Sequence, residues 1–478
     1  MSKVYKDLRE FLATLEEEGQ LVRVKEQVNP EPDIGTAGRA AANLKNGPAV
    51  FFENIRGYKT PVVTNVHGSW ANHALMLGMP KDTPVKEQFE ELNRRWDLFP
   101  VPPKILPREE ALCKQNVIDK DINLFDVLAL YRINEQDGGS FISKASIISG
   151  DPSEPDNLNK QNVGTYRIQV KDKDRVGIQA LAMHDIAVQL EQAERKNEKL
   201  PIAITLGNNP LVTFMASTPV GYDQNEYEFV GALQDGVPFE ITPADTAPHL
   251  YVPAHCEVVL EGYIIPRVRE VEGPFGEFPG SYSGARLQCE VKITHITHRD
   301  NPIFENLYLG IPWTEIDYLM ALNTSVPLYK QLKETMPEVQ AVNAMYTHGM
   351  LAIVSTKVRY GGYGKGVAFR LLSTPHGMPY TKVVIVVDEF VDPFNLEQVM
   401  WAITTRVKPD KDVAIIPNCP GMPLDPSSVP PGIHTKMIID ATTPTPPEKI
   451  ERETQLLETP KDTAKWEGII RGLLDNLK

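Results

Sequence analysis

Two glutamates stand five positions apart in a loop rich in glycine and proline. Residues 271–280 read Val-Glu-Gly-Pro-Phe-Gly-Glu-Phe-Pro-Gly, which places Glu272 and Glu277 on either side of a Gly-Pro-Phe-Gly centre. Because glycine and proline each impose a particular backbone geometry, we expect a fixed loop rather than a helix. Such a loop could aim two carboxyl groups into one pocket for acid–base chemistry, or it could be the acidic, solvated end of a hairpin.

An amide, an imidazole and a carboxylate form a second candidate set upstream of that loop. Asn162 stands at the start of a predicted strand, five positions before Arg167. Each member has a structural explanation, since Asn162 could cap a turn, His184 could cap the helix after it, and Glu226 could favour the positive end of its helix. Together the three donors suit Mn²⁺ or Mg²⁺, and the imidazole favours Mn²⁺. Three protein ligands would leave coordination positions open for a phosphate oxygen of a cofactor.

Familiar nucleotide-binding motifs are missing from the sequence. It contains neither G-x-G-x-x-G nor the P-loop pattern, so it does not support an ordinary dinucleotide or P-loop site. The segment Gly361-Gly-Tyr-Gly-Lys365 is glycine-rich and carries a lysine, but a lone match of this kind is a weak sign of a phosphate site.

Composition excludes several classes of partner. The 478 residues allow two or three domains with substantial cores, and 42% hydrophobic with 23% charged residues is ordinary for a globular protein. A net charge of −14 argues against binding to nucleic acid or an anionic membrane. No apolar run approaches the roughly 18 residues that span a bilayer. Four widely spaced cysteines indicate reduced thiols and a cytoplasmic location: Cys113, Cys256, Cys289 and Cys419.

Hydrophobic periodicity divides the chain into three units. The first combines predicted helices at 7–20 and 85–96 with strands at 21–24, 49–53 and 61–66. The second is strand-rich and predicts a mixed sheet or barrel from strands at 140–148, 163–170, 175–179, 201–205, 257–265, 287–296 and 303–308, with helices at 185–196 and 225–233. The third alternates buried strands at 351–355, 382–387 and 413–416 with helices at 364–373 and 394–407, before a linker at 441–461 and a helix at 463–477.

Several short motifs, in order along nearly the whole chain, resemble those of the UbiD-like decarboxylases, which use prenylated FMN. They are 162–167, 183–184, 226–227 with 230–233, 272–277, 364–365, 387–388, 401–406 and 436–440. Within that family the chain is most similar to the large subunit of bacterial hydroxyarylic acid decarboxylases. That closer likeness is carried by Gln161-Asn-Val-Gly, by 308–318 and by 342–348.

The resemblance implies a fold and a domain order. It implies an α+β, multidomain protein with an N-terminal α/β unit at 1–115 and a central split β-barrel flavin-binding domain at 116–315. A C-terminal α/β oligomerisation domain at 316–460 and a trailing helix at 461–478 would follow. The implied assembly is a homo-oligomer, a dimer or a hexamer.

The resemblance also implies roles for individual residues. Asn162, His184 and Glu226 would hold Mn²⁺ against the cofactor phosphate, with K⁺ as an optional second ion. Arg167, Glu272 and Glu277 would form the catalytic set. The prenylated FMN would further contact Val163, Gly164, Thr165, Tyr166, Arg167, Met183, Pro219 and Lys365, with Lys365 at the phosphate.

The implied reaction is the reversible, non-oxidative decarboxylation of an aromatic acid of the 4-hydroxybenzoate, vanillate or protocatechuate type. Loss of CO₂ leaves an in-plane aryl carbanion that needs an electron sink, which a covalently reacting cofactor supplies. We expect Glu277 to protonate the carbon, because an apolar pocket raises a carboxyl pKa, and Glu272 to stay ionised against Arg167. Implied partners are the acid substrate, a flavin prenyltransferase that supplies the cofactor, and small accessory subunits.

Other functions stay open at this point. The substrate could be another unsaturated or heteroaryl acid. A different class of enzyme, a flavin reductase with ordinary FMN on a split barrel, has no evident use for an arginine with two glutamates. A non-catalytic scaffold would keep the fold without the chemistry, although every residue that the family mechanism needs is present.

Overall fold

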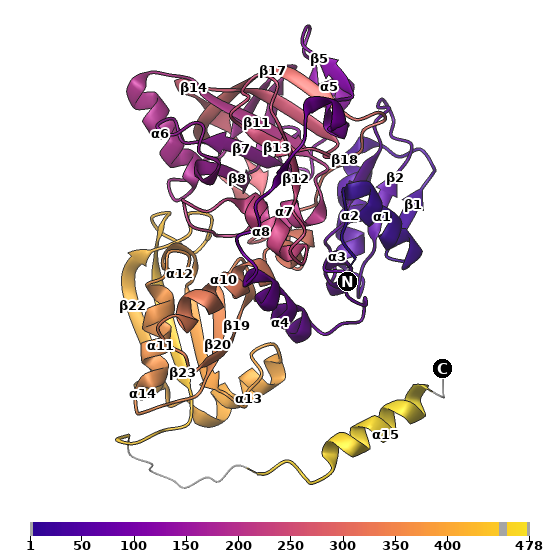
Figure 1. The fold of residues 1–478 in the computed structure, drawn as a ribbon. Coiled ribbons are helices and arrows are strands. Elements are labelled where there is room, and N and C mark those ends of the chain that lie inside the picture. Colours follow the sequence, from indigo (N-terminus) through magenta and orange to yellow (C-terminus); the bar gives the residue numbers. More distant parts are fainter. Residues whose placement is uncertain (1–2, 449–456, 476–478) are drawn as a thin grey trace.

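The structure, a computed structural model, describes residues 3–448 and 457–475 and shows a mixed α+β fold of several regions (Figure 1). An N-terminal region lies beside a large central sheet, and a C-terminal region lies below that sheet in the same view. Among the described residues, no helix is both long and apolar enough to cross a membrane.

The N-terminal region is built on a four-stranded sheet. Its strands run in the order β1 (Leu21–Val24), β2 (Ala49–Phe52), β3 (Val62–Thr64) and β18 (Phe304–Glu305), with helices α1 (Leu8–Glu17), α2 (Gly35–Ala42) and α3 (Trp70–Met76). In α1 the side chain of Asp7 caps the first turn, and Leu8, Phe11, Leu12 and Leu15 bury one helical face. The expected helix at 7–20 and the strands of this region are therefore confirmed.

Strand β18 corrects the sequence-based prediction, which placed 303–308 in the central sheet. The amide of Phe304 donates to Pro61 O at 2.9 Å, and that of Asn306 donates to Val63 O at 3.1 Å. The chain therefore crosses from the central region back to β3, where it pairs in parallel. Periodicity predicted the strand but carries no information about which edge it pairs with.

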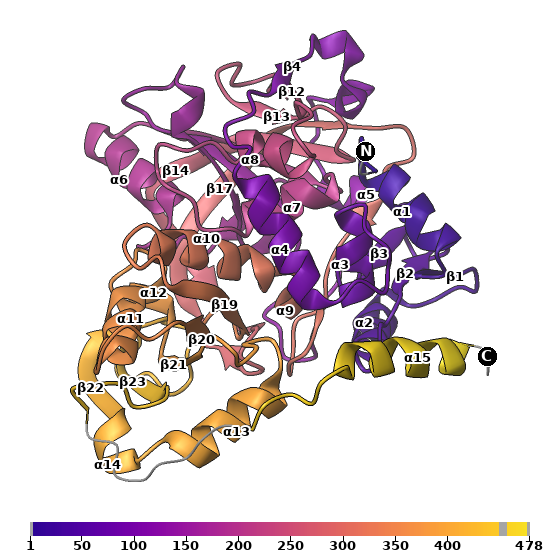
Figure 2. The same cartoon turned by 60° about the horizontal axis from the view of Figure 1, so that its bottom comes forward.

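Helix α4 (Val85–Trp96), predicted at these residues, packs against helices of both other regions (Figure 2). It contacts α8 (Glu226–Leu233) in the central region and α10 (Leu322–Lys333) in the C-terminal region. Its buried Arg95 donates to the carbonyls of Leu233 and Leu77, each at 2.7 Å. The bond to Leu233 gives the last carbonyl of α8 a hydrogen-bond partner that the helix itself cannot supply.

The central region contains a nine-stranded sheet. Along the sheet the strands are β6 (Phe141–Ile142), β9 (Ile168–Asp172), β10 (Arg175–Ile178), β17 (Arg286–His298), β14 (Val258–Glu272), β11 (Leu200–Leu206), β7 (Ser146–Gly150) and β8 (Gln161–Thr165), and β5 (Asn116–Ile118) pairs with β17. No pairing among the described strands joins β6 to β8, so the sheet is open. Helices α6 (Asp185–Lys196), at the predicted residues, and α7 (Pro210–Ala216) pack near it.

Two predicted strands of this region are each divided in the structure. The prediction at 140–148 becomes β6 and β7, and that at 163–170 becomes β8 and β9. The second break falls at Tyr166 and Arg167, where the chain leaves one end of the sheet and rejoins it beside β10. A side chain at such a break does not have to point to alternate faces of the sheet as strand residues do. Arg167 can therefore reach Glu272 at the end of β14.

Two small sheets complete the central region. One joins β4 (Lys104–Ile105), β12 (Glu240–Pro243) and β13 (Tyr251–Pro253), and the other is a ribbon of β15 (Phe275–Gly276) and β16 (Tyr282–Ser283). The ribbon carries the glutamate loop.

The C-terminal region is a five-stranded sheet with helices on both faces. The strand order is β19 (Val339–Tyr346), β20 (Leu351–Thr356), β21 (Val383–Asp388), β23 (Ile433–Ala441) and β22 (Val413–Pro420). Two separate apolar clusters lie against it, one beside α10 and α11 (Tyr363–Leu372) and one beside α13 (Leu396–Arg406). The apolar runs predicted as doubly covered strands are confirmed at 351–355 and 382–387, whereas 413–416 forms the edge strand β22, in which Ile415 is 60% exposed.

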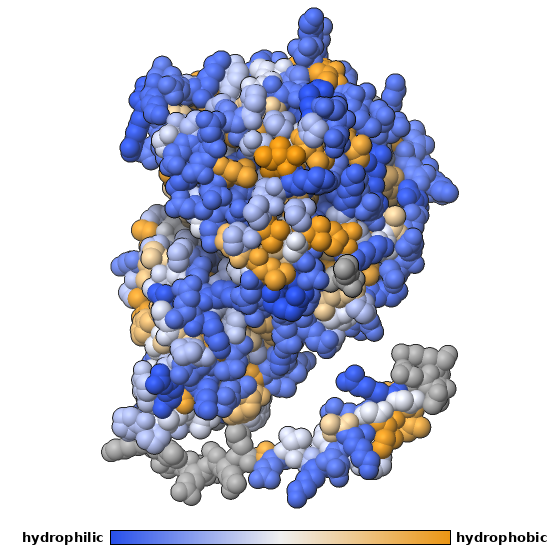
Figure 3. Space-filling model, in the orientation of Figure 1, coloured by the Kyte–Doolittle hydropathy of each residue, from blue (hydrophilic) through white to orange (hydrophobic). Residues whose placement is uncertain are grey.

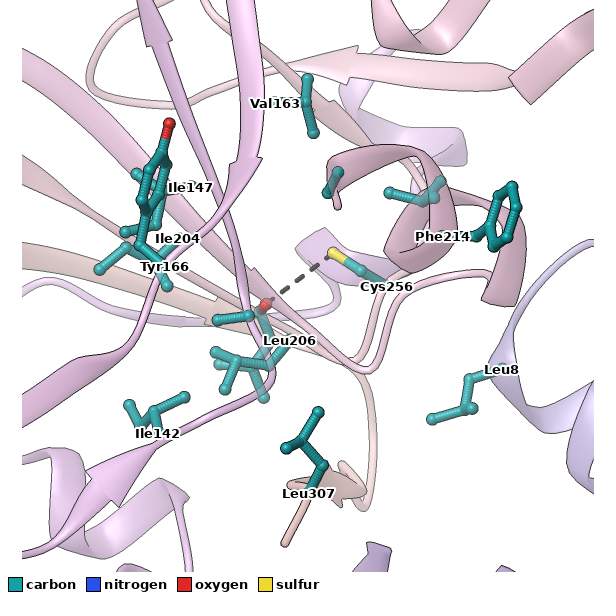
Figure 4. Packing of buried hydrophobic residues seen from close by; sticks show 14 of the residues in the cluster. Leu8, Ile142, Ile147, Val163, Tyr166, Ile204, Leu206, Phe214, Cys256 and Leu307 are labelled. Atoms are coloured by element: carbon teal, nitrogen blue, oxygen red, sulfur yellow. Dashed lines mark hydrogen bonds between the residues drawn. The ribbon is translucent and has the colours of Figure 1, made fainter. Parts of the chain in front are cut away.

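The N-terminal and central regions share one continuous core. Leu8 of α1, Phe214 of α7 and Leu206 of β11 belong to the same buried cluster (Figure 4). Burial of this size is the main favourable contribution to folding, and a shared core means that the two regions stabilise each other.

Helix α15 (Thr463–Asp475) follows the linker and stands apart from the other regions in Figure 1. The predicted helix at 463–477 is thus confirmed as far as residue 475; its last two positions, and 449–456 of the predicted linker, lie outside the described residues. Apolar surface gathers on this helix (Figure 3), where the exposed side chains are Trp466, Ile469, Ile470, Leu473 and Leu474.

Candidate active site

The loop that carries the two glutamates is held by hydrogen bonds at both ends. Strand β14 runs into Glu272, and Gly273 (φ +90°) and Gly280 (φ +81°) adopt the left-handed conformation that favours glycine. The amide of Gly273 donates to the Gln169 side chain at 3.0 Å, and that of Glu277 donates to Ser281 O at 3.0 Å. The prediction of a fixed loop is confirmed, and its glutamates are buried rather than solvated.

A buried aspartate fixes the middle of the loop. Asp137 accepts hydrogen bonds from the amides of Gly276 at 2.8 Å, Asn134 at 2.8 Å and Ile133 at 3.1 Å. Burial raises the pKa of Asp137 although these three amides lower it. A carboxylate with three amide donors is a rigid junction between residues 133–137 and the loop.

Arg167 binds both glutamates of the loop. Its Nε donates to Glu272 Oε1 at 2.9 Å and its Nη2 to Glu272 Oε2 at 2.5 Å, a bidentate ion pair. Its Nη1 donates to Glu277 Oε1 and, at 2.9 Å, to Ser283 Oγ. The exposed fractions are 8% for Arg167, 0% for Glu272 and 6% for Glu277, so the whole cluster is shielded from water.

The cluster has one cation and two carboxyl groups. Burial raises the pKa of Glu277, Arg167 opposes that rise, and Glu272 adds to it. Burial also acts to lower the pKa of Arg167, but Glu277 and Glu272 outweigh it and the pKa rises. One cation cannot neutralise two buried anions, so Glu277 is the carboxyl group that retains a proton most readily.

The predicted metal ligands converge around Tyr166. Asn162 Nδ2 lies 3.4 Å from the Tyr166 hydroxyl, and the rings of Tyr166 and His184 have centroids 5.1 Å apart. Glu226 lies against the backbone amide of Val163, the residue after Asn162. Asn162 on β8, His184 before α6 and Glu226 at the start of α8 therefore come from three elements and meet beside Tyr166 and β8.

The donor atoms of this set fit a divalent cation. Glu226 Oε2 is buried without a hydrogen-bond partner in the described part of the chain, and burial raises the pKa of Glu226 to about 8. Burial lowers the pKa of His184 to about 4, so the imidazole is neutral, as a metal ligand must be. The His184 side chain does not cap α6, so the structure does not support helix capping as its role.

Most of the remaining predicted cofactor residues lie near this set. Val163, Gly164 and Thr165 form β8 with Asn162, and Thr165 Oγ1 lies 3.2 Å from Ser217 Oγ, two residues before Pro219. Met183, next to His184, is 36% exposed. Lys365 is placed differently: it lies on α11 and its Nζ donates to Lys411 O, at the end of the C-terminal region where α14 (Pro409–Asp412) lies (Figure 1). The structure does not bring Lys365 to the other candidates.

Several residues of the site were missed by sequence reasoning. Ser283 binds Arg167, and the Phe275 ring lies 5.4 Å from its guanidinium. From the C-terminal region, His348 stacks on Phe278, and the Tyr380 hydroxyl lies 3.5 Å from His184 Nε2. These residues come from distant segments or have ordinary types, so no spacing signal could have identified them.

Comparison with known families matches the chain to three domains of 3-octaprenyl-4-hydroxybenzoate carboxy-lyase. Residues 12–92 match its N-terminal domain, 104–312 its Rift-related domain and 317–441 its C-terminal domain. These matches follow the three regions of the fold.

Curated relatives match over nearly their full length. The chain is 79% identical to a phenolic acid decarboxylase of Sedimentibacter hydroxybenzoicus, over 100% of this chain and 99% of the relative. It is 57% identical to a phenolic acid decarboxylase of Bacillus subtilis, over 98% of this chain and 99% of the relative.

Solved structures agree with these relatives. The vanillic acid decarboxylase of Sedimentibacter hydroxybenzoicus in closed form has a TM-score of 0.95 at 79% identity and covers 99% of this chain and 100% of that one. The UbiD-class enzyme HmfF of Pelotomaculum thermopropionicum in complex with FMN has a TM-score of 0.81 at 32% identity, with 96% and 98% covered.

Proposed function

The chain belongs to the UbiD family of carboxy-lyases, and from that premise we propose that it decarboxylates a hydroxylated aromatic acid to a phenol and CO₂. The proposed substrates are acids of the 4-hydroxybenzoate, vanillate or protocatechuate type. The observation that carries the proposal is the buried Arg167–Glu272–Glu277 cluster, in which one carboxyl group has a raised pKa. The names of the relatives, phenolic acid and vanillic acid decarboxylase, support this substrate class.

Prenylated FMN, when bound, supplies the electron sink that an aryl carbanion lacks. Glu277 gives its proton to the ring carbon after CO₂ has left and is then recharged from solvent. Arg167 orients the substrate carboxylate. Its Nη1 donates to Glu277 and Ser283, so this edge of the guanidinium lies beside the proton donor, where the carboxylate must be held for the reaction. Glu272 holds Arg167 in place by accepting two parallel hydrogen bonds from its guanidinium group.

The metal and cofactor sites are part of the proposal. Asn162, His184 and Glu226 would hold Mn²⁺, supported by the unpartnered Glu226 Oε2 and the neutral His184. The segment from Val163 to Arg167, with Met183 and Pro219, would line the flavin. A solved relative of the same class, an evolved dimeric HmfF, is in complex with prenylated FMN. Lys365 lacks such support, since it contacts Lys411 instead.

We also assign roles to the regions. The central region, 116–315, would be the split-barrel flavin domain between an N-terminal unit at 1–115 and an oligomerisation domain at 316–460 with its helix at 461–478. The exposed apolar face of α15 supports a homo-oligomer, a dimer or a hexamer. A related structure contains a second component, ShVdcD, which supports an accessory subunit. The cofactor requires a flavin prenyltransferase, and four free cysteines support a cytoplasmic location.

The test is Glu277→Gln in protein produced together with a flavin prenyltransferase. The variant should bind cofactor, with the wild-type visible spectrum, and lose decarboxylation by at least about 100-fold, because general acid catalysis contributes that much. Glu270→Gln is the control, since Glu270 lies seven residues earlier, on β14, and pairs with Arg175 at 3.0 Å instead of Arg167. Near-normal turnover by Glu277→Gln would remove Glu277 as the proton donor. An ordinary oxidised FMN spectrum in the wild type would argue for the flavin reductase.

A further inference from the structure

A cleft of about 170 Å³ lies beside Glu277, between the β15–β16 ribbon and residues 423–431 of the C-terminal region. Glu277 and Ser283 line one wall. Leu424, Pro426 and Ser428 line the other. An apolar cavity of about 150 Å³ is known to hold one benzene molecule, so this cleft has room for one aromatic ring.

The far wall carries a hydroxyl group that lacks a partner. Ser428 is 6% exposed, and within the described residues its Oγ has no hydrogen-bond partner. A buried hydroxyl without a partner is costly, and such groups in native structures are explained by water or by a ligand. The polar groups of the near wall differ, because Glu277 and Ser283 each already accept a hydrogen bond from Arg167.

The segment that carries Ser428 is rigid. Asp425 accepts from Lys382 Nζ at 2.9 Å and from the amide of Ser427 at 2.9 Å, and the amide of Ser428 donates to Asp425 O at 3.0 Å. A hydroxyl that is held in this way can select a ligand, because its orientation does not have to be fixed on binding.

We propose that this cleft receives the aromatic ring of the substrate and that Ser428 binds a ring hydroxyl, which makes it a specificity-determining residue. The inference rests on the proposed function and deepens it. The acid would enter with its carboxylate toward Arg167 and Glu277 and its hydroxyl toward the far wall. Preference for hydroxylated acids would then arise because an acid without the hydroxyl leaves Ser428 unpaired.

The two walls belong to different regions of the fold. The ribbon extends from the central sheet, whereas 423–431 connects β22 and β23 of the C-terminal sheet. The ring site therefore exists only when the two regions are close together.

The experiment measures binding of 4-hydroxybenzoate and of benzoate by calorimetry to cofactor-loaded Glu277→Gln protein, the variant that the proposed function expects to be inactive. The variants add Ser428→Ala, Ser428→Thr or Ser281→Ala to that background. Ser281→Ala is the matched control, because it removes a hydroxyl from the opposite, partly exposed wall where water can replace it.

Ser428→Ala should weaken 4-hydroxybenzoate about fivefold to tenfold, the usual size for one neutral hydrogen bond, and leave benzoate within about twofold. Ser428→Thr and Ser281→Ala should keep the preference. Equal weakening of both acids, or of neither, by Ser428→Ala would overturn the assignment.

This result is separate from the test of the proposed function. If Glu277→Gln retains turnover but Ser428→Ala abolishes the preference, the proton donor is wrong and the ring site stands. If Glu277→Gln is inactive and the preference survives Ser428→Ala, the reaction stands and Ser428 is wrong.

Discussion

Phe278 and His348 stack face to face between the glutamate loop and the C-terminal sheet, with ring centroids 3.7 Å apart and planes 11° apart. Phe278 directly follows Glu277. His348 lies in the turn between β19 and β20, where Thr347, His348 and Gly349 have φ values of 49°, 55° and 77°. A side chain in the left-handed region costs about 1–3 kcal/mol, so the surrounding structure must hold this turn in place. The position of Glu277 thus depends on the C-terminal region.

Removing the imidazole should slow the reaction more than it weakens substrate binding. We expect His348→Asn to lower kcat several-fold, because the stack contributes about 1 kcal/mol and asparagine tolerates the left-handed backbone. His348→Phe keeps the stack but places a bulky side chain in the left-handed region, so it should recover only part of the lost kcat. Steady-state kinetics of both variants checks this, and equal impairment of the two would show that the ring contact is unimportant.

Activity should fall as the pH rises through the pKa of Glu277. Burial raises that pKa above its ordinary value of 4.5, so the donor stays protonated in a range where an exposed glutamate is ionised. The folded protein retains a proton that the unfolded chain releases. The resulting stability is complete below the unfolded pKa and is lost as the pH rises through the folded one.

Glu277→Gln lacks this titration. The melting temperature of the variant should therefore rise relative to that of the wild type as the pH increases. A difference in melting temperature that does not change with pH would contradict the raised pKa of Glu277.

Truncating Glu226 should release the metal and the flavin together. Glu226→Ala removes the buried carboxylate whose Oε2 has no partner in the described structure, so the cation loses its only anionic protein ligand of the proposed three. We expect Mn²⁺ and flavin contents of the purified variant to fall at least tenfold by elemental analysis and absorbance. Glu228→Ala is the control, since Glu228 lies on the same helix and is only partly buried. Full cofactor in Glu226→Ala would refute the clamp.

Asp137→Ala should loosen the glutamate loop, because it removes the carboxylate that binds the amide of Gly276. Three amides lose their acceptor, and buried donors that are left unpaired cost about 1–3 kcal/mol each before relaxation. We expect a lower melting temperature and faster amide hydrogen exchange at Gly276. Unchanged exchange at Gly276 would mean that the ribbon and Arg167 hold the loop without Asp137.

Local pattern was sufficient for many elements. Helices α4 and α6 occupy the residues that periodicity predicted, and the doubly buried strands of the C-terminal sheet were recognisable as apolar runs. The division of 163–170 was not predictable, because the residues on both sides of Arg167 alternate as one strand would. The break is set by which neighbour each half pairs with: β8 pairs with β7 and β9 with β10.

The candidate site divides in the same way. Residue types indicated Arg167, Glu272 and Glu277, yet the ion pair spans 105 positions, and no spacing rule predicts a contact at that distance. Phe278 and His348 are ordinary residues whose importance comes only from their meeting. Lys365 differs from these residues, since the family resemblance implies a phosphate contact, and in the structure its side chain contacts Lys411 of α14.

The pairing of β18 with β3 bears on how the chain folds during synthesis. Until residue 305 has left the ribosome, one edge of the first sheet lacks its neighbour, and an exposed edge is open to pairing with other chains. The N-terminal region is therefore not a module that can be transplanted by cutting the chain at residue 92 or 115. A fragment that is meant to fold must supply β18 again, through a linker, or it will present β3 to its neighbours.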